Sequence, residues 1–108
     1  MYKREAKGYW INTARIINKV LFDEYLSITT PWLKEVGGQL FAKDTEPIGK
    51  EGTEDANFAV ICEFSSMKAA VEAYESKEYK EYSKLRKQST ENSTFTIIEG
   101  LDEAAKLR

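Results

Sequence analysis

The stretch from Phe58 to Arg86 constrains the fold of this chain more than any other part of the sequence. It opens with the apolar run Phe-Ala-Val-Ile-Cys-Glu-Phe, reaches the pair Ser65-Ser66, and continues with apolar residues at helical spacing. This change of period predicts a buried strand over residues 57–64, followed by an amphipathic helix capped by one of the two serines. Ser76 predicts the cap of a second helical segment.

The remaining elements follow from the same reading of periodicity and turn residues. Aromatic and β-branched residues predict three more strands, over residues 8–17, 39–43 and 94–99. A core-facing helix is predicted between an Asn18 cap and the pair Gly37-Gly38, and Pro31 is expected to kink or restart it. The polar segment 44–56 is the one long loop, which we expect to act as a lid.

This order of elements predicts an α+β fold with a split βαβ arrangement. A four-stranded antiparallel sheet would then carry two main helices on one face. The strand over residues 57–64 is apolar on both sides, with Phe58, Val60, Cys62 and Phe64 on one side and Ala59 and Ile61 on the other. Because no element is left to cover the second face, we expect a second copy of the chain to pack on it, sheet to sheet, as a homodimer.

Length and charge exclude several classes of protein. With 108 residues the chain is expected to form one domain, residues 1–108, with tails over residues 1–7 and 102–108. A net charge of -2 and a pI near 5.3 argue against binding nucleic acid. The sequence has neither a long apolar run nor the apolar core of a signal peptide, so we expect a cytoplasmic protein with no membrane segment.

The rare residue types limit the chemistry. The sequence contains no histidine and a single cysteine, Cys62. The usual catalytic base, the usual zinc ligand and the Ser-His-Asp and Cys-His arrangements are therefore absent, and no thiol-based metal cluster can form. We expect no metal site and no redox cofactor, and the lack of histidine disfavours haem.

The segment from Glu63 to Arg86 carries a resemblance to a known family. Glu63-Phe64-Ser65-Ser66-Met67, followed by Tyr74, Ser76, Glu78-Tyr79 and Arg86, is similar to the DUF1330 family over about residues 8–101. The resemblance implies a ferredoxin-like fold and the sheet-to-sheet homodimer of the dimeric α/β-barrel superfamily. The chain departs from the family in the first helix, where the usual Asp-Pro start is replaced by Val-Leu-Phe-Asp. The family has no agreed activity, and the wider superfamily includes several kinds of enzyme, so the resemblance names no reaction.

Glu63 is the main candidate for a catalytic residue. A carboxylate inside an apolar strand either has a raised pKa and acts as a general base, or pairs with a cation. The cations available are Arg86 and Arg15. A structural ion pair, within the chain or across the dimer, is the alternative to catalysis.

The aromatic residues and one amide are candidates for a binding site. They could line a pocket between sheet and helices, or helical spacing could place most of them in the core; the set is Trp10, Asn12, Tyr25, Trp32, Tyr74 and Tyr79.

Two functions are consistent with these candidate residues. The first is an enzyme or binder of a small organic molecule, with Glu63 as base, Asn12, Tyr79 or Arg86 orienting the ligand, and the 44–56 loop as roof. The second is a non-catalytic homodimeric module in which Glu63 forms a structural ion pair.

Overall fold

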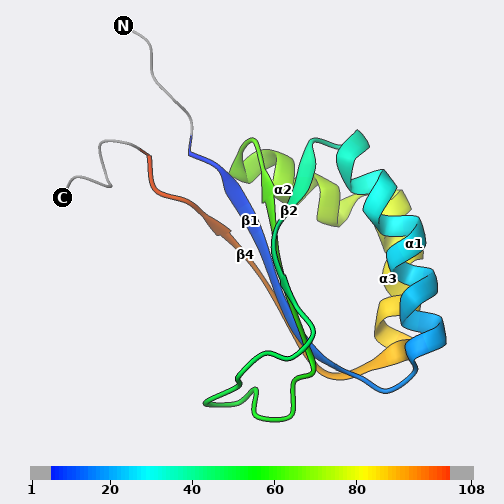
Figure 1. Ribbon diagram of the computed structural model, residues 1–108. Coiled ribbons are helices and arrows are strands. Elements are labelled where there is room, and N and C mark those ends of the chain that lie inside the picture. The colour runs from blue at the N-terminus through cyan, green and yellow to red at the C-terminus, as the bar shows by residue number, and fades with distance from the viewer. Residues whose placement is uncertain (1–5, 103–108) are drawn as a thin grey trace, which may run out of the picture.

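The computed structural model describes residues 6–102, which form a four-stranded antiparallel sheet and three helices. The helices all cover one face of the sheet (Figure 1). Within the sheet the strand order is β2-β3-β1-β4. The elements are β1 Gly8–Ile16, α1 Lys19–Glu35, β2 Gly38–Asp44, β3 Phe58–Phe64, α2 Met67–Glu75, α3 Lys77–Ser89 and β4 Thr90–Glu99. The predicted α+β, ferredoxin-like arrangement is confirmed, with the second helical region divided into α2 and α3.

Side-chain caps define where each helix begins. The Asn18 side chain accepts a hydrogen bond from the Leu21 N–H at 3.1 Å, which starts α1. Of the serine pair it is Ser66 that caps α2, through the Ala69 N–H at 3.1 Å. Ser76 ends α2 and caps α3. All three predicted caps are confirmed, because these side chains satisfy N–H groups that a helix leaves free in its first turn.

Apart from shifts of one residue at strand ends, the elements differ from the prediction at two places. α1 runs through Pro31 as a single helix, so the expected restart does not occur. β4 begins at Thr90, four residues before the predicted start at Thr94, and its polar first half pairs with the end of β1 beside a register shift between Thr13 and Arg15. Those residues were not recognised as a strand because backbone pairing with β1, rather than an apolar pattern, holds them there.

Trp10 lies at the centre of the core between sheet and helices. Its indole N–H donates to the Ala70 carbonyl at 2.8 Å, which ties β1 to α2. Five aromatic rings lie within 6.5 Å of it, centroid to centroid: Trp32, Phe64, Tyr74, Tyr79 and Phe95. These contacts join α1, α2 and α3 to the sheet through one side chain.

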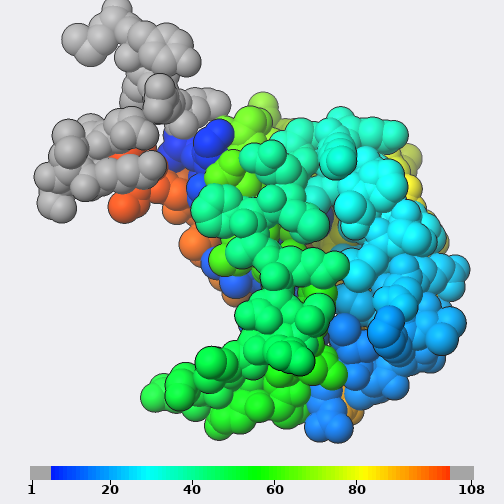
Figure 2. Space-filling view, viewed as in Figure 1, coloured from blue at the N-terminus to red at the C-terminus, as the bar shows by residue number. Residues whose placement is uncertain are grey.

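The other face of the sheet carries no element from the described part of the chain. Ile11 of β1 lies directly opposite Ile61 of β3 on this face, and both are only partly buried. Phe41 is 61% exposed and Ile98 is 43% exposed. Residues 45–57 extend from the sheet toward this side, away from the helices (Figures 1 and 2). We call this surface the open face.

The double role of Ser76 leads to a stability prediction. We expect Ser76→Ala to lower the free energy of unfolding by about 1 kcal/mol, since the Tyr79 N–H loses its hydrogen-bond acceptor. Ser27→Ala is the matched control, because Ser27 lies on the exposed side of α1 and caps no helix. Urea unfolding followed by circular dichroism measures both. Equal stability of the two variants would contradict the capping role.

Candidate functional site

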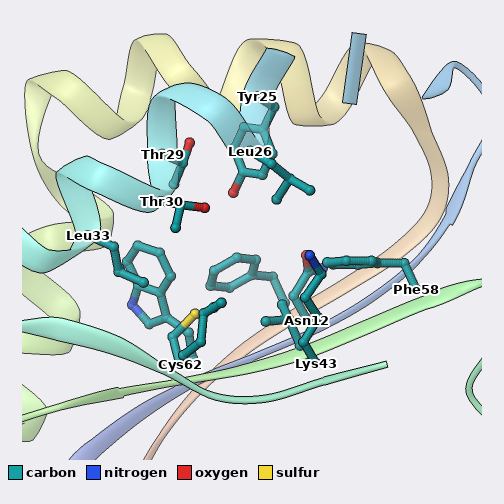
Figure 3. Close-up of a pocket in the computed structure, with 13 residues that line it drawn as sticks. Asn12, Tyr25, Leu26, Thr29, Thr30, Leu33, Lys43, Phe58 and Cys62 are labelled. Atoms are coloured by element: carbon teal, nitrogen blue, oxygen red, sulfur yellow. The ribbon is translucent and has the colours of Figure 1, made fainter. Parts of the chain in front are cut away.

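A pocket lies between α1 and the helix-covered face of the sheet (Figure 3). About 40 Å³ of it is open to the centres of water-sized molecules. One water needs roughly 10–15 Å³ on this measure, so the enclosed part holds about three waters or a few ligand atoms. Its walls are mainly apolar and include Trp10, Leu26, Leu33, Phe58, Cys62 and Phe95.

Polar side chains enter this pocket from both of its walls. α1 contributes Tyr25, Thr29 and Thr30, and the sheet contributes Asn12 and Lys43. The Tyr25 hydroxyl points from α1 toward the sheet, whereas Lys43 extends from β2 toward α1 (Figure 3). Thr29 Oγ1 is buried and has no hydrogen-bond partner within residues 6–102. An apolar cavity with a few converging polar groups is the usual form of a small-molecule site.

A chain of hydrogen bonds, of which the first two are buried, starts at the pocket and runs behind it. The Tyr25 and Tyr79 hydroxyls are 2.7 Å apart. Arg86 Nε donates to the Tyr79 hydroxyl at 3.1 Å, and Arg86 Nη1 lies 3.4 Å from Ser93 Oγ. Asn12 Nδ2 donates to the same Ser93 Oγ at 3.2 Å and to the Thr94 carbonyl at 2.6 Å. The chain therefore returns to the pocket at Asn12.

Arg86 is the one charged group in this hydrogen-bond chain, and it is only 3% exposed. No salt bridge to a carboxylate is found for it within the described residues. Its guanidinium is held by the Tyr79 and Ser93 hydroxyls and lies 4.9 Å from the centre of the Phe95 ring. Hydroxyl oxygens and an aromatic face thus hold this buried cation, and no carboxylate of residues 6–102 forms an ion pair with it.

Both tyrosines of the chain keep their protons at neutral pH. Burial raises the pKa of Tyr25 well above its ordinary value, and the neighbouring Tyr79 raises it further. Burial also raises the pKa of Tyr79, although the Arg86 charge acts in the opposite direction. Both groups are therefore hydrogen-bond donors rather than phenolates.

The structure brings together only some of the predicted site residues. Trp10, Asn12 and Tyr25 line the pocket. Tyr79 and Arg86 lie behind Tyr25 and act on the pocket through its hydroxyl. Trp32 stacks on Tyr79, and Tyr74 packs against Trp10 and Phe95, so these two belong to the core.

Sequence reasoning missed Lys43, Thr29 and Thr30. Lys43 belongs to a short strand at the edge of the sheet, and the two threonines sit in a helix with no motif of their own. A signal was present in the helix, because Thr29 and Thr30 lie in its interior, where threonine is neutral to unfavourable. The position of Lys43 depends on a register shift between Leu40 and Ala42, which the sequence pattern does not reveal.

Glu63 lies away from the pocket, on the open face. Its carboxylate accepts hydrogen bonds from the Tyr9 hydroxyl and from Gln39 Nε2, each at 3.0 Å. The hydrogen bond that Tyr9 donates to Glu63 is the main reason that the pKa of Tyr9 is raised. An ion pair with Arg86 or Arg15, one of the two roles considered for Glu63, does not form within residues 6–102, because Arg86 lies on the helix side and Arg15 pairs with Glu91 at 3.5 Å. A pair across the dimer stays a prediction.

The predicted lid does not roof the pocket. No residue of the segment 44–56 lines it, and the segment projects toward the open face instead (Figure 1).

Among residues 6–102 we find no cluster of three or more side chains able to hold a metal ion. None of the helices in that range is long and apolar enough to cross a membrane.

Comparisons with known proteins agree with this architecture. Residues 7–101 match the model of the family described as Domain of unknown function (DUF1330). No curated protein sequence matches the chain. A protein of unknown function from Rhodopseudomonas palustris has a similar structure, with a TM-score of 0.73 and 21% identity over 92% of this chain and 85% of that one.

Two proteins with an activity in their names have the same fold. The hydroxynitrile lyase of Passiflora edulis has a TM-score of 0.66 and 14% identity over 94% of this chain and 97% of its own. A putative antibiotic biosynthesis monooxygenase of Nitrosomonas europaea has a TM-score of 0.64 and 14% identity over 95% of this chain and 98% of its own. At such identities the likeness shows the fold and no activity.

Cys62, in the pocket wall, makes stability depend on alkaline pH. Burial raises the pKa of its thiol from 9.0 to about 11. The folded state binds this proton more tightly than the unfolded state. The protonated thiol therefore makes its full contribution to the unfolding free energy below about pH 9, and this contribution is lost as the pH rises toward 11. The full loss is about 2 to 3 kcal/mol of unfolding free energy.

Urea unfolding of the protein and of Cys62→Ala from about pH 7 to about pH 11 tests this. We expect the variant to be less stable at neutral pH but to lose less stability above about pH 9. Tyr25 and Tyr79, whose pKa values are raised chiefly by burial, add a decline that is present in both proteins. Parallel curves would show that the thiol is not protected by the fold.

Proposed function

The chain belongs to the DUF1330 family, and we propose that it binds a small organic molecule in the pocket between α1 and the sheet, acting as a homodimer. The observation that supports the binding role is the composition of the pocket. Apolar walls of Trp10, Cys62 and Phe95 surround hydroxyl, amide and ammonium groups that come from two different layers of the fold. Such walls favour an apolar ligand body, and the polar groups fix its orientation.

Within this proposal the polar residues divide into two roles. Tyr25 and Lys43 would contact the ligand directly. Tyr79 and Arg86 are positioning residues, because they reach the ligand only through the Tyr25 hydroxyl. Glu63 has no part in the pocket, so it cannot act as a base on a ligand bound there.

Filling the pocket tests the binding role. Native mass spectrometry of the protein purified from its host should detect a bound small molecule, and Val60→Phe should abolish that adduct because Val60 lines the pocket. Val20→Phe is the matched control, since Val20 is 82% exposed on α1. We expect Val20→Phe to keep the adduct. An adduct that survives in Val60→Phe would place the ligand elsewhere.

The homodimer is supported by the apolar character of the open face. Tyr9, Ile11, Phe41, Ile61 and Ile98 form a continuous set across the four strands of the sheet. Apolar surface of this kind on a sheet is usually buried against another layer. A second copy related by a twofold axis brings an identical apolar sheet face and identical segments 45–57 that extend toward it.

A charge on the open face tests the dimer. The protein should elute at twice its 12.4 kDa mass in size-exclusion chromatography with light scattering, whereas Ile61→Lys should elute as a single chain. Val20→Lys places the same charge on the exposed side of α1 and should leave the dimer intact. A native protein at 12.4 kDa, or a dimer in Ile61→Lys, would refute the sheet-to-sheet assembly.

A non-catalytic interaction module is the second candidate function. It is favoured by the Glu63 carboxylate, whose hydrogen bonds to Tyr9 and Gln39 give it a structural role on the face proposed for assembly. In this case the pocket would hold only water. Native mass spectra would then show no small-molecule adduct with or without Val60→Phe, and the substitution would leave the assembly unchanged. The pocket experiment therefore separates the two candidates.

A further inference from the structure

The hydrogen-bond chain behind the pocket has a direction, which follows from the donors and acceptors that its members carry. Arg86 can only donate, so the Tyr79 oxygen accepts from Arg86 Nε. The Tyr79 proton then needs an acceptor, and the Tyr25 oxygen at 2.7 Å is the one that the described residues supply. With Tyr79 as donor, Tyr25 keeps its own O–H free to donate. The Tyr25 hydroxyl oxygen points from α1 toward the sheet, so this donor faces the pocket (Figure 3). Hydrogen bonds in such a chain polarise one another, so Tyr25 is a strengthened donor.

The charged side chain that lines the pocket and the one behind Tyr25 are both positive. Lys43 lines it, Arg86 lies one hydroxyl behind Tyr25, and no acidic residue is among the lining side chains within residues 6–102. Thr29, whose buried hydroxyl has no partner in that range, and Thr30 add hydroxyl groups on the same side as Tyr25. A group placed among them meets positive potential and O–H donors.

We infer that the pocket takes a small monocarboxylate, with its carboxylate between Tyr25 and Lys43 and its apolar body against Trp10, Cys62 and Phe95. The inference rests on the proposed function and names the ligand class of that same site. The enclosed space limits the buried body to a few carbon atoms, as in propionate or butyrate. A longer or aromatic acid has to extend through the mouth of the pocket.

Titrations with matched probes test the inference. Butyrate, butyramide and butanol have bodies of similar size, and only butyrate carries a charge. Chemical shifts of the Trp10 indole N–H, followed by NMR in the full-length protein, report occupancy because this ring forms part of the wall. We expect butyrate to bind at least about tenfold more tightly than butyramide or butanol.

Two variants assign the carboxylate contacts. Tyr25→Phe removes the O–H donor, and Lys43→Gln removes the charge from an exposed residue whose replacement leaves the core untouched. Each should weaken butyrate binding by roughly threefold to tenfold and should leave butanol binding unchanged. Lys68→Gln is the control for loss of one surface charge, because Lys68 lies on α2 and does not line the pocket.

The outcomes separate this inference from the function on which it rests. If the amide or the alcohol binds as well as butyrate, or if Lys43→Gln behaves like Lys68→Gln, the monocarboxylate is wrong and small-molecule binding stands. A second outcome also rules out the monocarboxylate: none of the three probes shifts the Trp10 signal, but the protein purified from its host still carries a small-molecule adduct. If the adduct is absent as well, the binding role itself fails.

Discussion

The Tyr79 hydroxyl is the group on which the packing of the helices over the sheet depends. It lies 2.7 Å from the Tyr25 hydroxyl of α1 and accepts from Arg86 of α3 at 3.1 Å, and the Tyr79 ring stacks on Trp32. Arg86 is buried, and a buried guanidinium that loses a partner costs several kcal/mol. One hydroxyl therefore allows a charge to lie inside the core and links the two long helices above it.

The two faces of the sheet have separate tasks because side chains alternate along each strand. On β3, Cys62 faces the pocket and the aromatic core, whereas Ile61 and Glu63 face the other side. On β1, Trp10 and Asn12 lie under the helices and Tyr9 and Ile11 lie on the open face. The proposed ligand binding belongs to the first face and the proposed assembly to the second, so substitutions can address one without the other.

Much of the fold could be predicted because its signals are local. Asn18, Ser66 and Ser76 cap helices through hydrogen bonds within three residues, and the apolar run of β3 identifies a buried strand without reference to the rest of the chain. The early start of β4 was missed because Thr90 is held by its partner Ile16 across the sheet.

The site was predicted in part: Trp10, Asn12 and Tyr25 line it, but Glu63 was placed with Arg86 although the sheet separates them.

By itself the sequence determined the element order, the helix starts and the apolar character of both faces of β3, because periodicity and capping depend on neighbours along the chain. Only the tertiary structure decided which polar groups meet. Tyr25 and Tyr79 are 54 residues apart, and Asn12 and Ser93 are 81 apart. Such contacts depend on strand register and on how helices lie across a sheet, and a shift of one residue in a strand exchanges its faces.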